Sequence, residues 1–350
     1  MLYKTKNPHG GDVYENKIVL DYSANTNPYG TPQGVIDAMT AAMPDVHQYP
    51  DPYCRKLVAA IAEYESVPQE YILCGNGAAE LIYSYFEAIK AKCAVELAPT
   101  FSEYSLGMEK VGTKVERYEL KQENNFMLDE EFFEFLADKR PEVIVLCNPN
   151  NPTGQLIPQA MLKKILSYCK ENDTKFFLDE CFMDLTGSGQ SISAELADNP
   201  NLFILKAFTK SFGMAGVRLG YCLCADSNTL SKMAEASQPW NISLLAQAAG
   251  VAALKEKEFL AKTVATVKEE RPILAKGLSD LGFWVCPGEA NYIFFKGPET
   301  LQAKLKEVNI AIRNCSNYYG LSDGWYRVAV RLRHQNEALL EAMRKAVGGK

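Results

Sequence analysis

The chain has 350 residues, 47% of them hydrophobic, which is enough for one large domain and a smaller second one. The formal net charge is −6 and Lys and Arg are scattered, which argues against a protein that binds nucleic acid or a membrane surface. No stretch approaches the ~20 apolar residues of a membrane span, and residues 1–6 lack the apolar region of a signal peptide.

Ten cysteines raise the question of disulfides or a metal site. There is no Cys-x-x-Cys pair, and the three histidines are far apart in the sequence. Half of the cysteines lie in apolar runs, where a free thiol acts as a small hydrophobic side chain: Cys74, Cys93, Cys147, Cys222 and Cys224. We therefore expect a reduced, cytoplasmic protein without structural metal.

Residues 1–50 are expected to form an irregular arm, because turn formers recur and apolar periodicity is missing. The clearest turn signals are Asn25–Gly30 and Tyr49–Tyr53, and one short helix is expected at 32–43. Such an arm needs the body of the protein or a partner subunit to lie on.

The segment after the arm alternates short apolar runs with helical patterns. Helices are expected at 55–66, 78–90, 102–111 and 158–171, and strands at 71–74, 94–97, 113–118, 142–147, 175–179, 202–205 and 218–224. Nearly wholly apolar strands that alternate with helices predict an α/β fold with a mostly parallel seven-stranded sheet between helices. Ligands bind such sheets beyond the carboxyl ends of the strands.

The last third of the chain predicts helices from 227 to about 282, with breaks at Pro239 and Pro272, and then a smaller α/β unit. That unit combines strands at 291–295, 310–313 and 327–331 with a final helix at 335–347. We therefore expect four parts: an arm at 1–50, a large domain at 51–240, connecting helices at 241–282 and a small domain at 283–350.

Lys210 follows the apolar run 202–205 and precedes a loop with two glycines. A desolvated lysine loses its charge readily and attacks carbonyl groups, which suits Schiff-base chemistry. The alternative is an ordinary solvated lysine.

Two glycine- or proline-rich loops follow apolar strands. The amides after Gly75-Asn-Gly77 open a helix and suit an anion, although an ordinary tight turn explains the same residues. In the loop 148–154, two Asn-Pro pairs indicate an extended, rigid segment that aims the amide of Asn151 at a ligand oxygen.

Asp179 ends an apolar strand, where an unpaired charge is costly. A protonated ring nitrogen would keep this carboxylate ionised. A helix cap or a salt bridge is the alternative.

A phosphate site, an amide, a buried aspartate and a lysine about 30 residues later together describe a pyridoxal phosphate pocket. With these motifs the chain resembles, nearly end to end, the aspartate-aminotransferase superfamily of fold type I. The resemblance implies that Lys210 forms the internal aldimine and that Asp179 pairs with the pyridine nitrogen. It also implies that Asn151 bonds the ring hydroxyl and that Phe101 stacks on the ring. The implied phosphate ligands are Gly77, Ala78, Ala79, Thr209, Arg218 and, from the partner subunit of a homodimer, Tyr49.

Two positions depart from the pattern of this superfamily. Phe182 stands where many relatives carry a tyrosine that bonds the ring hydroxyl, and Ala207 stands where a phosphate-binding Ser or Thr is common. Neither change removes an essential group, but each alters the surroundings of the cofactor.

Four arginines are candidates for gripping a substrate, because arginine suits bidentate capture of carboxylate or phosphate: Arg313, Arg327, Arg331 and Arg333. Surface ion pairing is the alternative, above all for Arg333.

Within the superfamily, the chain resembles L-threonine-O-3-phosphate decarboxylases of cobalamin biosynthesis and histidinol-phosphate aminotransferases. The stretches 9–11, 20–25, 238–240 and 312–321 favour the decarboxylases. That resemblance implies that Arg327 binds the substrate carboxylate, that His9 and Arg313 bind its phosphate, and that Asn25 lines the same end.

The expected reaction is decarboxylation of O-phospho-L-threonine to (R)-1-aminopropan-2-yl phosphate. O-phospho-L-serine is an alternative substrate, because one methyl group changes discrimination by only ~1–3 kcal/mol. The alternative activity is transamination of histidinol phosphate or aromatic amino acids with 2-oxoglutarate or glutamate. A non-enzymatic, ligand-sensing module is the third hypothesis.

Overall fold

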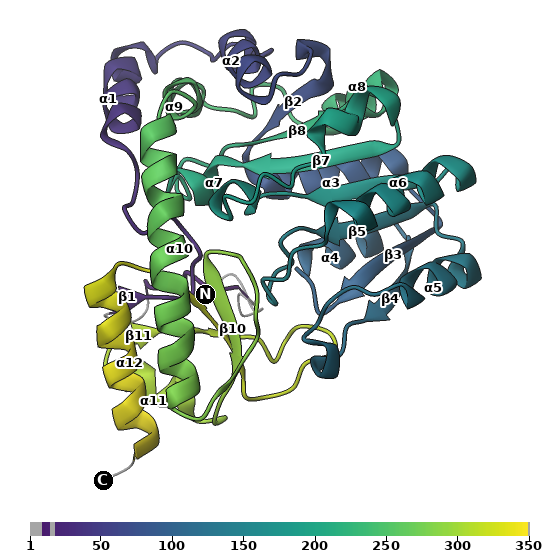
Figure 1. Ribbon diagram of the computed structural model, residues 1–350. Coiled ribbons are helices and arrows are strands. Elements are labelled where there is room, and N and C mark those ends of the chain that lie inside the picture. Colours follow the sequence, from purple (N-terminus) through teal and green to yellow (C-terminus); the bar gives the residue numbers. More distant parts are fainter. Residues whose placement is uncertain (1–8, 15–17, 349–350) are drawn as a thin grey trace.

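The computed structural model describes residues 9–14 and 18–348. Figure 1 shows a large sheet with helices on both faces and a smaller sheet beside it, with the long helix α10 passing along both. The large sheet has the order β2-β8-β7-β6-β5-β3-β4. Its strands are β2 (Ile72–Gly75), β3 (Cys93–Ala98), β4 (Lys114–Glu119), β5 (Val143–Cys147), β6 (Lys175–Asp179), β7 (Leu202–Ala207) and β8 (Gly220–Cys224).

The predicted sheet of seven mostly parallel strands is confirmed. Only β8 runs antiparallel to its neighbours, β2 and β7, while the other adjacent pairs are parallel. The register sets Cys147 opposite Asp179 and Asp179 opposite Leu205. The carboxyl ends of β5, β6 and β7 therefore meet at one edge of the sheet.

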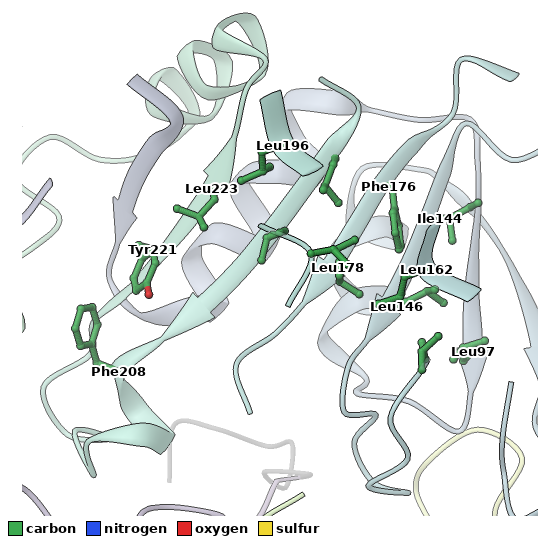
Figure 2. Packing of buried hydrophobic residues seen from close by; sticks show 14 of the residues in the cluster. Leu97, Ile144, Leu146, Leu162, Phe176, Leu178, Leu196, Phe208, Tyr221 and Leu223 are labelled. Carbon is green, nitrogen blue, oxygen red and sulfur yellow. The ribbon is translucent and has the colours of Figure 1, made fainter. Parts of the chain in front are cut away.

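Alternating side chains of the central strands form two cores, one on each face of the sheet. Figure 2 shows one face, where Ile144, Leu146, Phe176 and Leu178 pack with Leu162. Each of these side chains is fully buried, which contributes about 1.5–3 kcal/mol apiece. The opposite face packs against another set of helices and includes Val145, Phe177, Phe203, Leu205, Tyr85 and Tyr104.

Seven helices of the described residues flank the large sheet. They are α2 (Arg55–Glu65), α3 (Gly77–Ile89), α4 (Glu103–Lys110), α5 (Glu131–Lys139), α6 (Gln159–Asn172), α7 (Phe208–Ser211) and α8 (Ser227–Ala236). Helix α5 was not predicted from the sequence, although Phe132 and Leu136 are buried at i, i+4 spacing on one face. Short 3₁₀ turns also occur: η1 (Met43–Asp45), η2 (Gln69–Tyr71), η3 (Gln122–Asn124), η4 (Met183–Leu185) and η5 (Ser193–Asp198).

The small sheet has the order β12-β13-β10-β9 and is antiparallel. Its strands are β9 (Trp284–Val285), β10 (Tyr292–Lys296), β12 (Arg313–Asn314) and β13 (Trp325–Ala329), with helices α11 (Leu301–Glu307) and α12 (Arg333–Gly348). The arm joins this unit, since β1 (Leu20–Asp21) pairs with β11 (Ile310–Ala311) and Tyr22 enters its core. The expected domain boundaries at residues 50, 240 and 282 stay predictions.

The connecting helices differ from expectation at one proline. Between α8 and α10, the helix α9 (Leu244–Ala253) packs against α1 (Gln33–Ala42), and Pro239 lies in the break before α9 as predicted. The predicted break at Pro272 is wrong, because this residue lies inside the continuous helix α10 (Lys257–Asp280). Val267 and Leu274 bury one face of α10, and this packing holds the helix together despite the missing hydrogen bond.

Within residues 9–14 and 18–348, no helix combines the length and apolar character needed to cross a membrane.

Candidate active site

A cavity of ≈ 240 Å³ lies at the edge where β5, β6 and β7 end. Their last residues, Cys147, Asp179 and Ala207, all line it. Most of the predicted site residues also line it, the exceptions being Gly77, Tyr49 and two of the four candidate arginines, Arg331 and Arg333. Those in the lining are His9, Asn25, Ala78, Ala79, Phe101, Asn151, Asp179, Thr209, Lys210, Arg218, Arg313 and Arg327.

Lys210 lies on the short helix α7, directly after β7. Burial, together with the positive charges of Arg327 and Arg218, lowers the pKa of its amine to about 8, while Asp179 acts in the opposite direction. The Lys210 Nζ atom lies 5.6 Å from the centre of the Phe182 ring. The amine is therefore able to lose its proton near neutral pH and act as a nucleophile.

Asp179 is held by two hydrogen bonds. The Tyr104 hydroxyl donates to Oδ2 at 2.5 Å, and the backbone N–H of Cys181 donates to Oδ1 at 2.8 Å. Burial raises the pKa of Asp179, whereas these two bonds and the nearby Lys210 lower it. The bond from Cys181 is a local turn contact and not a helix cap, since the next helical turn, η4, begins at Met183 with Phe182 as its N-cap residue.

Tyr104 was missed by the sequence analysis. It lies on α4, three residues after Phe101, so the same strand-to-helix connection supplies both residues to the cavity. Burial raises its pKa well above the usual range, so the hydroxyl keeps its proton and donates to Asp179. An aromatic residue at helical spacing from Phe101 was the only sequence signal.

The loop 148–154 turns back on itself, so the expected extended conformation is wrong. The N–H of Gly154 donates to the carbonyl of Asn150 at 2.6 Å, which closes a turn around Asn151. The Asn150 Nδ2 donates to the Thr153 Oγ1 within the turn at 3.1 Å and to the Pro99 carbonyl at 3.0 Å, and these bonds favour the turn over an extended segment. The Asn151 Oδ1 atom accepts from the Arg327 Nη1 and from the Tyr318 hydroxyl at 3.3 Å. The N–H₂ group of the same side chain is therefore the one that can donate to a ligand.

The N-terminus of α3 and Arg218 form a cradle suited to an anion. The first amides of a helix have no partner within it and attract negative charge. Gly77 has φ +79°, and a Cβ there would lie 2.7 Å from the Arg218 Nη2. A Cβ at Gly220 would lie 2.8 Å from the Ala78 nitrogen. Gly77 thus does not line the cavity but allows Arg218 to approach the helix end.

Arg327 on β13 lies at the other end of the cavity and is buried. Its Nη2 donates to the Ser23 carbonyl at 2.9 Å. The side-chain amide of Asn25 is assigned with its oxygen facing Arg327. In this orientation its Oδ1 accepts from the Arg327 Nη1 at 3.2 Å and from Nε at 3.1 Å. The guanidinium also lies 5.4 Å from the centre of the Tyr292 ring. The arm and β13 together therefore fix this arginine.

Arg313 on β12 is also buried. Its Nη1 donates to the Asn314 carbonyl at 2.6 Å and its Nη2 to the Asn317 Oδ1 at 2.8 Å. The remaining two candidates are elsewhere: Arg331 bonds arm carbonyls such as that of Ala24 at 3.0 Å, and Arg333 forms an ion pair with Glu270 at 2.8 Å. Neither lines the cavity.

His9 reaches the cavity from the arm. Its Nε2 lies 2.7 Å from the Glu103 Oε1, and the Tyr83 hydroxyl donates to the Glu103 Oε2 at 2.8 Å. The bond from His9 is the largest cause of a lowered pKa of Glu103. The His9 and Phe101 ring centres are 5.5 Å apart. Glu103 and Tyr83 were not predicted from the sequence.

Tyr49 does not line the cavity of its own chain. It is 79% exposed, and its ring packs at a tilt of 33° against that of Trp240 with centres 4.8 Å apart. Its expected place in a partner's site stays a prediction. The two departures, Phe182 and Ala207, both line the cavity, and Phe182 packs against Tyr292 with ring centres 5.0 Å apart.

Among residues 9–14 and 18–348, no group of three or more His, Cys, Asp or Glu side chains is arranged to hold a metal ion.

Comparison with known proteins identifies the family. The family model for aminotransferase class I and II matches residues 17–345, so the chain belongs to that family. It is 33% identical to threonine-phosphate decarboxylase of Salmonella typhimurium, over 97% of both chains. It is also 33% identical to histidinol-phosphate aminotransferase of Anaeromyxobacter sp., over 94% of this chain and 91% of that one.

Solved structures agree with the fold. Histidinol-phosphate aminotransferase of Clostridium acetobutylicum superposes with a TM-score of 0.89 at 29% identity, covering 95% of this chain and 100% of that one. The Sinorhizobium meliloti histidinol-phosphate aminotransferase, solved in complex with pyridoxal-5'-phosphate, has a TM-score of 0.83 at 20% identity, covering 95% and 93%. The predicted family, fold type and pyridoxal phosphate cofactor are confirmed.

The residues of the cavity fit this cofactor. A lysine with a lowered pKa, a buried aspartate and a helix N-terminus opened by Gly77 match its aldehyde, ring nitrogen and phosphate. When bound, pyridoxal phosphate withdraws electrons from the substrate Cα and makes its bonds labile. The chain is thus a pyridoxal-phosphate-dependent enzyme, and its own residues decide which bond breaks.

Proposed function

We propose that this enzyme decarboxylates O-phospho-L-threonine to (R)-1-aminopropan-2-yl phosphate, the step known from cobalamin biosynthesis, with O-phospho-L-serine as a smaller alternative substrate. The observation that carries the proposal is that two buried arginines, Arg313 and Arg327, line the same small cavity as Lys210. A substrate with both a carboxylate and a phosphate matches two such cations, because a buried charge needs a partner.

At the cofactor end, the proposed roles follow the family. Lys210 would carry the cofactor, Asp179 would pair with its ring nitrogen and Asn151 would donate to its hydroxyl. Phe101 would stack on the ring. The phosphate would be bound by the helix amides at Gly77, Ala78 and Ala79, by Thr209, by Arg218 and by Tyr49 of the partner subunit.

At the substrate end, Arg327 would bind the α-carboxylate, with Asn25 and Ser23 holding the guanidinium in place. His9 and Arg313 would bind the substrate phosphate.

Decarboxylation balances when the carboxylate leaves as carbon dioxide and one proton is added to Cα. Lys210 Nζ would deliver that proton, since its pKa of about 8 lets it hold and release a proton near neutral pH. Arg327 would set the direction in which the carboxylate points while it leaves.

The test is an assay of the purified enzyme with pyridoxal phosphate and O-phospho-L-threonine. The expected products are carbon dioxide and (R)-1-aminopropan-2-yl phosphate in equal amounts. Replacement Arg313→Met should raise the KM for this substrate about 10–100-fold, as loss of a charged hydrogen-bonded pair predicts, and should change binding of L-threonine much less. Absence of both products would contradict the proposal.

Transamination of histidinol phosphate is the second candidate activity. It is favoured by two histidinol-phosphate aminotransferases, one 33% identical to this chain and one whose structure matches it with a TM-score of 0.89. Its phosphorylated substrate would use the same end of the cavity as the phosphate of phosphothreonine. Formation of glutamate from 2-oxoglutarate and histidinol phosphate, without carbon dioxide, would establish it.

We also propose a cytoplasmic homodimer. All ten cysteines are free thiols, as a reducing compartment allows. The exposed Tyr49 would reach the phosphate site of the second subunit, so each site needs two chains. Mixing Tyr49→Ala and Lys210→Ala chains should restore activity in heterodimers, and a monomer by light scattering would contradict the idea.

A further inference from the structure

The run Asn25–Gly30 was singled out in the sequence only as a turn, yet one of its residues contacts the turn that bears Lys210. Asn27 is 1% exposed. Its backbone N–H donates to the Lys210 carbonyl at 3.1 Å, and its side-chain Nδ2 donates to the Ser211 carbonyl at 2.7 Å. Two successive carbonyls of the lysine-bearing helix are therefore bound by one residue of the arm.

The other polar atoms of Asn27 are also paired. Its Oδ1 accepts from the Tyr29 N–H at 2.9 Å, its carbonyl accepts from the Gly30 N–H at 3.1 Å, and its Nδ2 also bonds the Thr263 Oγ1 of α10 at 2.8 Å. Rotation of this amide would leave several buried polar groups unpaired, at a cost of about 1–3 kcal/mol each. The orientation of Asn27 is thus fixed from three sides.

Contacts beyond Asn27 press the arm against the same turn. The Thr31 hydroxyl donates to the Gly213 carbonyl at 2.9 Å. A Cβ at Gly213 would lie only 2.3 Å from the Gly30 carbonyl oxygen, so the two backbones touch. The helix α7 has only four residues, and so short a helix is not stable without external contacts. The position of Lys210 therefore depends on the arm.

The other end of this arm segment holds Arg327. The Ser23 carbonyl and the Asn25 amide bind its guanidinium, and Asn27 follows two residues later along the chain. A run of five residues thus connects the arginine of the substrate end with the lysine of the cofactor end. The distance between the two groups is set by this segment as well as by the two sheets.

We infer that Asn27 is a positioning residue for Lys210. It holds the backbone of the lysine turn so that Nζ faces the cavity, and its loss slows the reaction of that amine with the cofactor's aldehyde. The inference concerns the cofactor of the family, not the choice between decarboxylation and transamination, so it stands or falls apart from the proposed reaction.

The test compares how fast the full-length chain, freed of cofactor, attaches pyridoxal phosphate. The variant Asn27→Asp keeps an oxygen for the Tyr29 N–H but lacks the Nδ2 donor to Ser211. Samples are reduced with borohydride at timed intervals, and the modified Lys210 peptide is measured by mass spectrometry. We expect attachment about 10–100-fold slower than in the unchanged protein, because small misplacements of a reacting group have effects of this size. For whichever substrate is turned over, kcat should fall while KM stays within about twofold.

The matched control is Asn199→Asp, far from the cavity, which likewise loses an Nδ2 donor to a backbone carbonyl, that of Glu195 at 2.7 Å. It should attach the cofactor at the normal rate even where its melting temperature falls as much as that of Asn27→Asp. Normal attachment by a folded Asn27→Asp chain would overturn the inference.

Where Asn27→Asp does not fold, Thr263→Val decides the question. It removes one acceptor of the Asn27 amide without touching the lysine turn. Attachment several-fold slower supports the positioning role, and attachment at the normal rate overturns it.

Discussion

The two ends of the cavity are assembled in different ways. The cofactor end consists of the carboxyl ends of neighbouring strands in one sheet, together with the first turn of α3. The substrate end combines His9 and Asn25 of the arm with Arg313 and Arg327 of the small sheet, and Arg327 contacts a residue 304 positions earlier in the chain. The first end is therefore set by the strand-to-loop connections of one sheet, with Asn27 of the arm bound to the lysine turn, and the second by how distant segments pack.

This difference separates two questions about the enzyme. Cofactor chemistry depends on the edge of the large sheet at which β5, β6 and β7 end. The choice of reaction depends on side chains held by the arm and the small sheet, whose contacts are few and long-range. Replacements at the two ends should therefore have separable effects, on cofactor attachment or on substrate recognition.

The largest effect is expected from Lys210→Ala at the cofactor end. Without the amine, covalent attachment of the cofactor is lost and turnover should fall about 10³–10⁴-fold, as for removal of an acid–base group. Borohydride reduction followed by mass spectrometry should find no modified peptide. The surface variant Lys164→Ala, which removes only an exposed ion pair with Glu130, should behave like the unchanged protein. Retained turnover by Lys210→Ala would show that the Lys210 amine is not needed at the cofactor end of the cavity.

Next in size is Arg327→Met at the substrate end. It removes a buried cation and leaves the Ser23 carbonyl and the Asn25 amide unpaired, so kcat/KM should fall about 30–1,000-fold, or about 2–4 kcal/mol. Cofactor attachment should remain, since Lys210 and Asp179 are intact. Arg333→Met is the control, because its guanidinium pairs with Glu270 away from the cavity. Equal losses in both variants would show that Arg327 has only a structural role.

A smaller effect, and one on pH dependence, is expected from Tyr104→Phe. Burial already raises the pKa of Asp179, and the Tyr104 bond lowers it. Loss of that bond raises the pKa further, so the carboxylate becomes protonated at higher pH and the acidic limb of the pH–rate profile should move to higher pH.

The control for this shift is Tyr85→Phe. The Tyr85 hydroxyl is buried in the same core but has no hydrogen-bond partner among the described residues. Its removal should leave the pH profile in place. An unshifted profile in Tyr104→Phe would show that the bond to Asp179 does not help keep the carboxylate ionised.

The smallest effect is expected from Glu103→Gln. The change keeps the shape of the side chain but removes the negative charge that faces His9, in a partly exposed ion pair worth about 0.2–1 kcal/mol. The KM for the phosphorylated substrate should rise about 1.5–5-fold without a change in kcat. Glu109→Gln on the same helix, whose carboxylate bonds Arg117, is the control. A lower kcat would contradict a role confined to substrate binding.

Much of the cofactor end could be predicted from local patterns in the sequence. Asn151, Asp179 and Lys210 each follow an apolar strand, and parallel strands bring such positions to one edge of a sheet. The seven strands were also predicted, since apolar runs mark them all except the charged edge strand β4. Local patterns were sufficient because the relevant contacts are local or follow from the sheet.

The remaining features depend on packing that no local pattern shows. His9 was named only through family resemblance, and Arg313 and Arg327 were distinguished from the other candidate arginines only in that way, because nothing in their neighbouring residues indicates that they share a cavity. Tyr104 and Glu103 were missed since their partners come from other elements. The helix at Pro272 was mispredicted for the same reason: the packing of α10 outweighs the local preference of proline.

The edge strand β4 has a consequence for how subunits associate. Its sequence, Lys-Val-Glu-Arg-Tyr-Glu, places charges along the outer edge of the large sheet, where Lys114 pairs with Glu116 and Arg117 with Glu96. Charged side chains at an exposed edge oppose the addition of another strand and so protect against aggregation. A continuous sheet shared by two copies is therefore disfavoured at this edge, and copies that associate must do so through other surfaces.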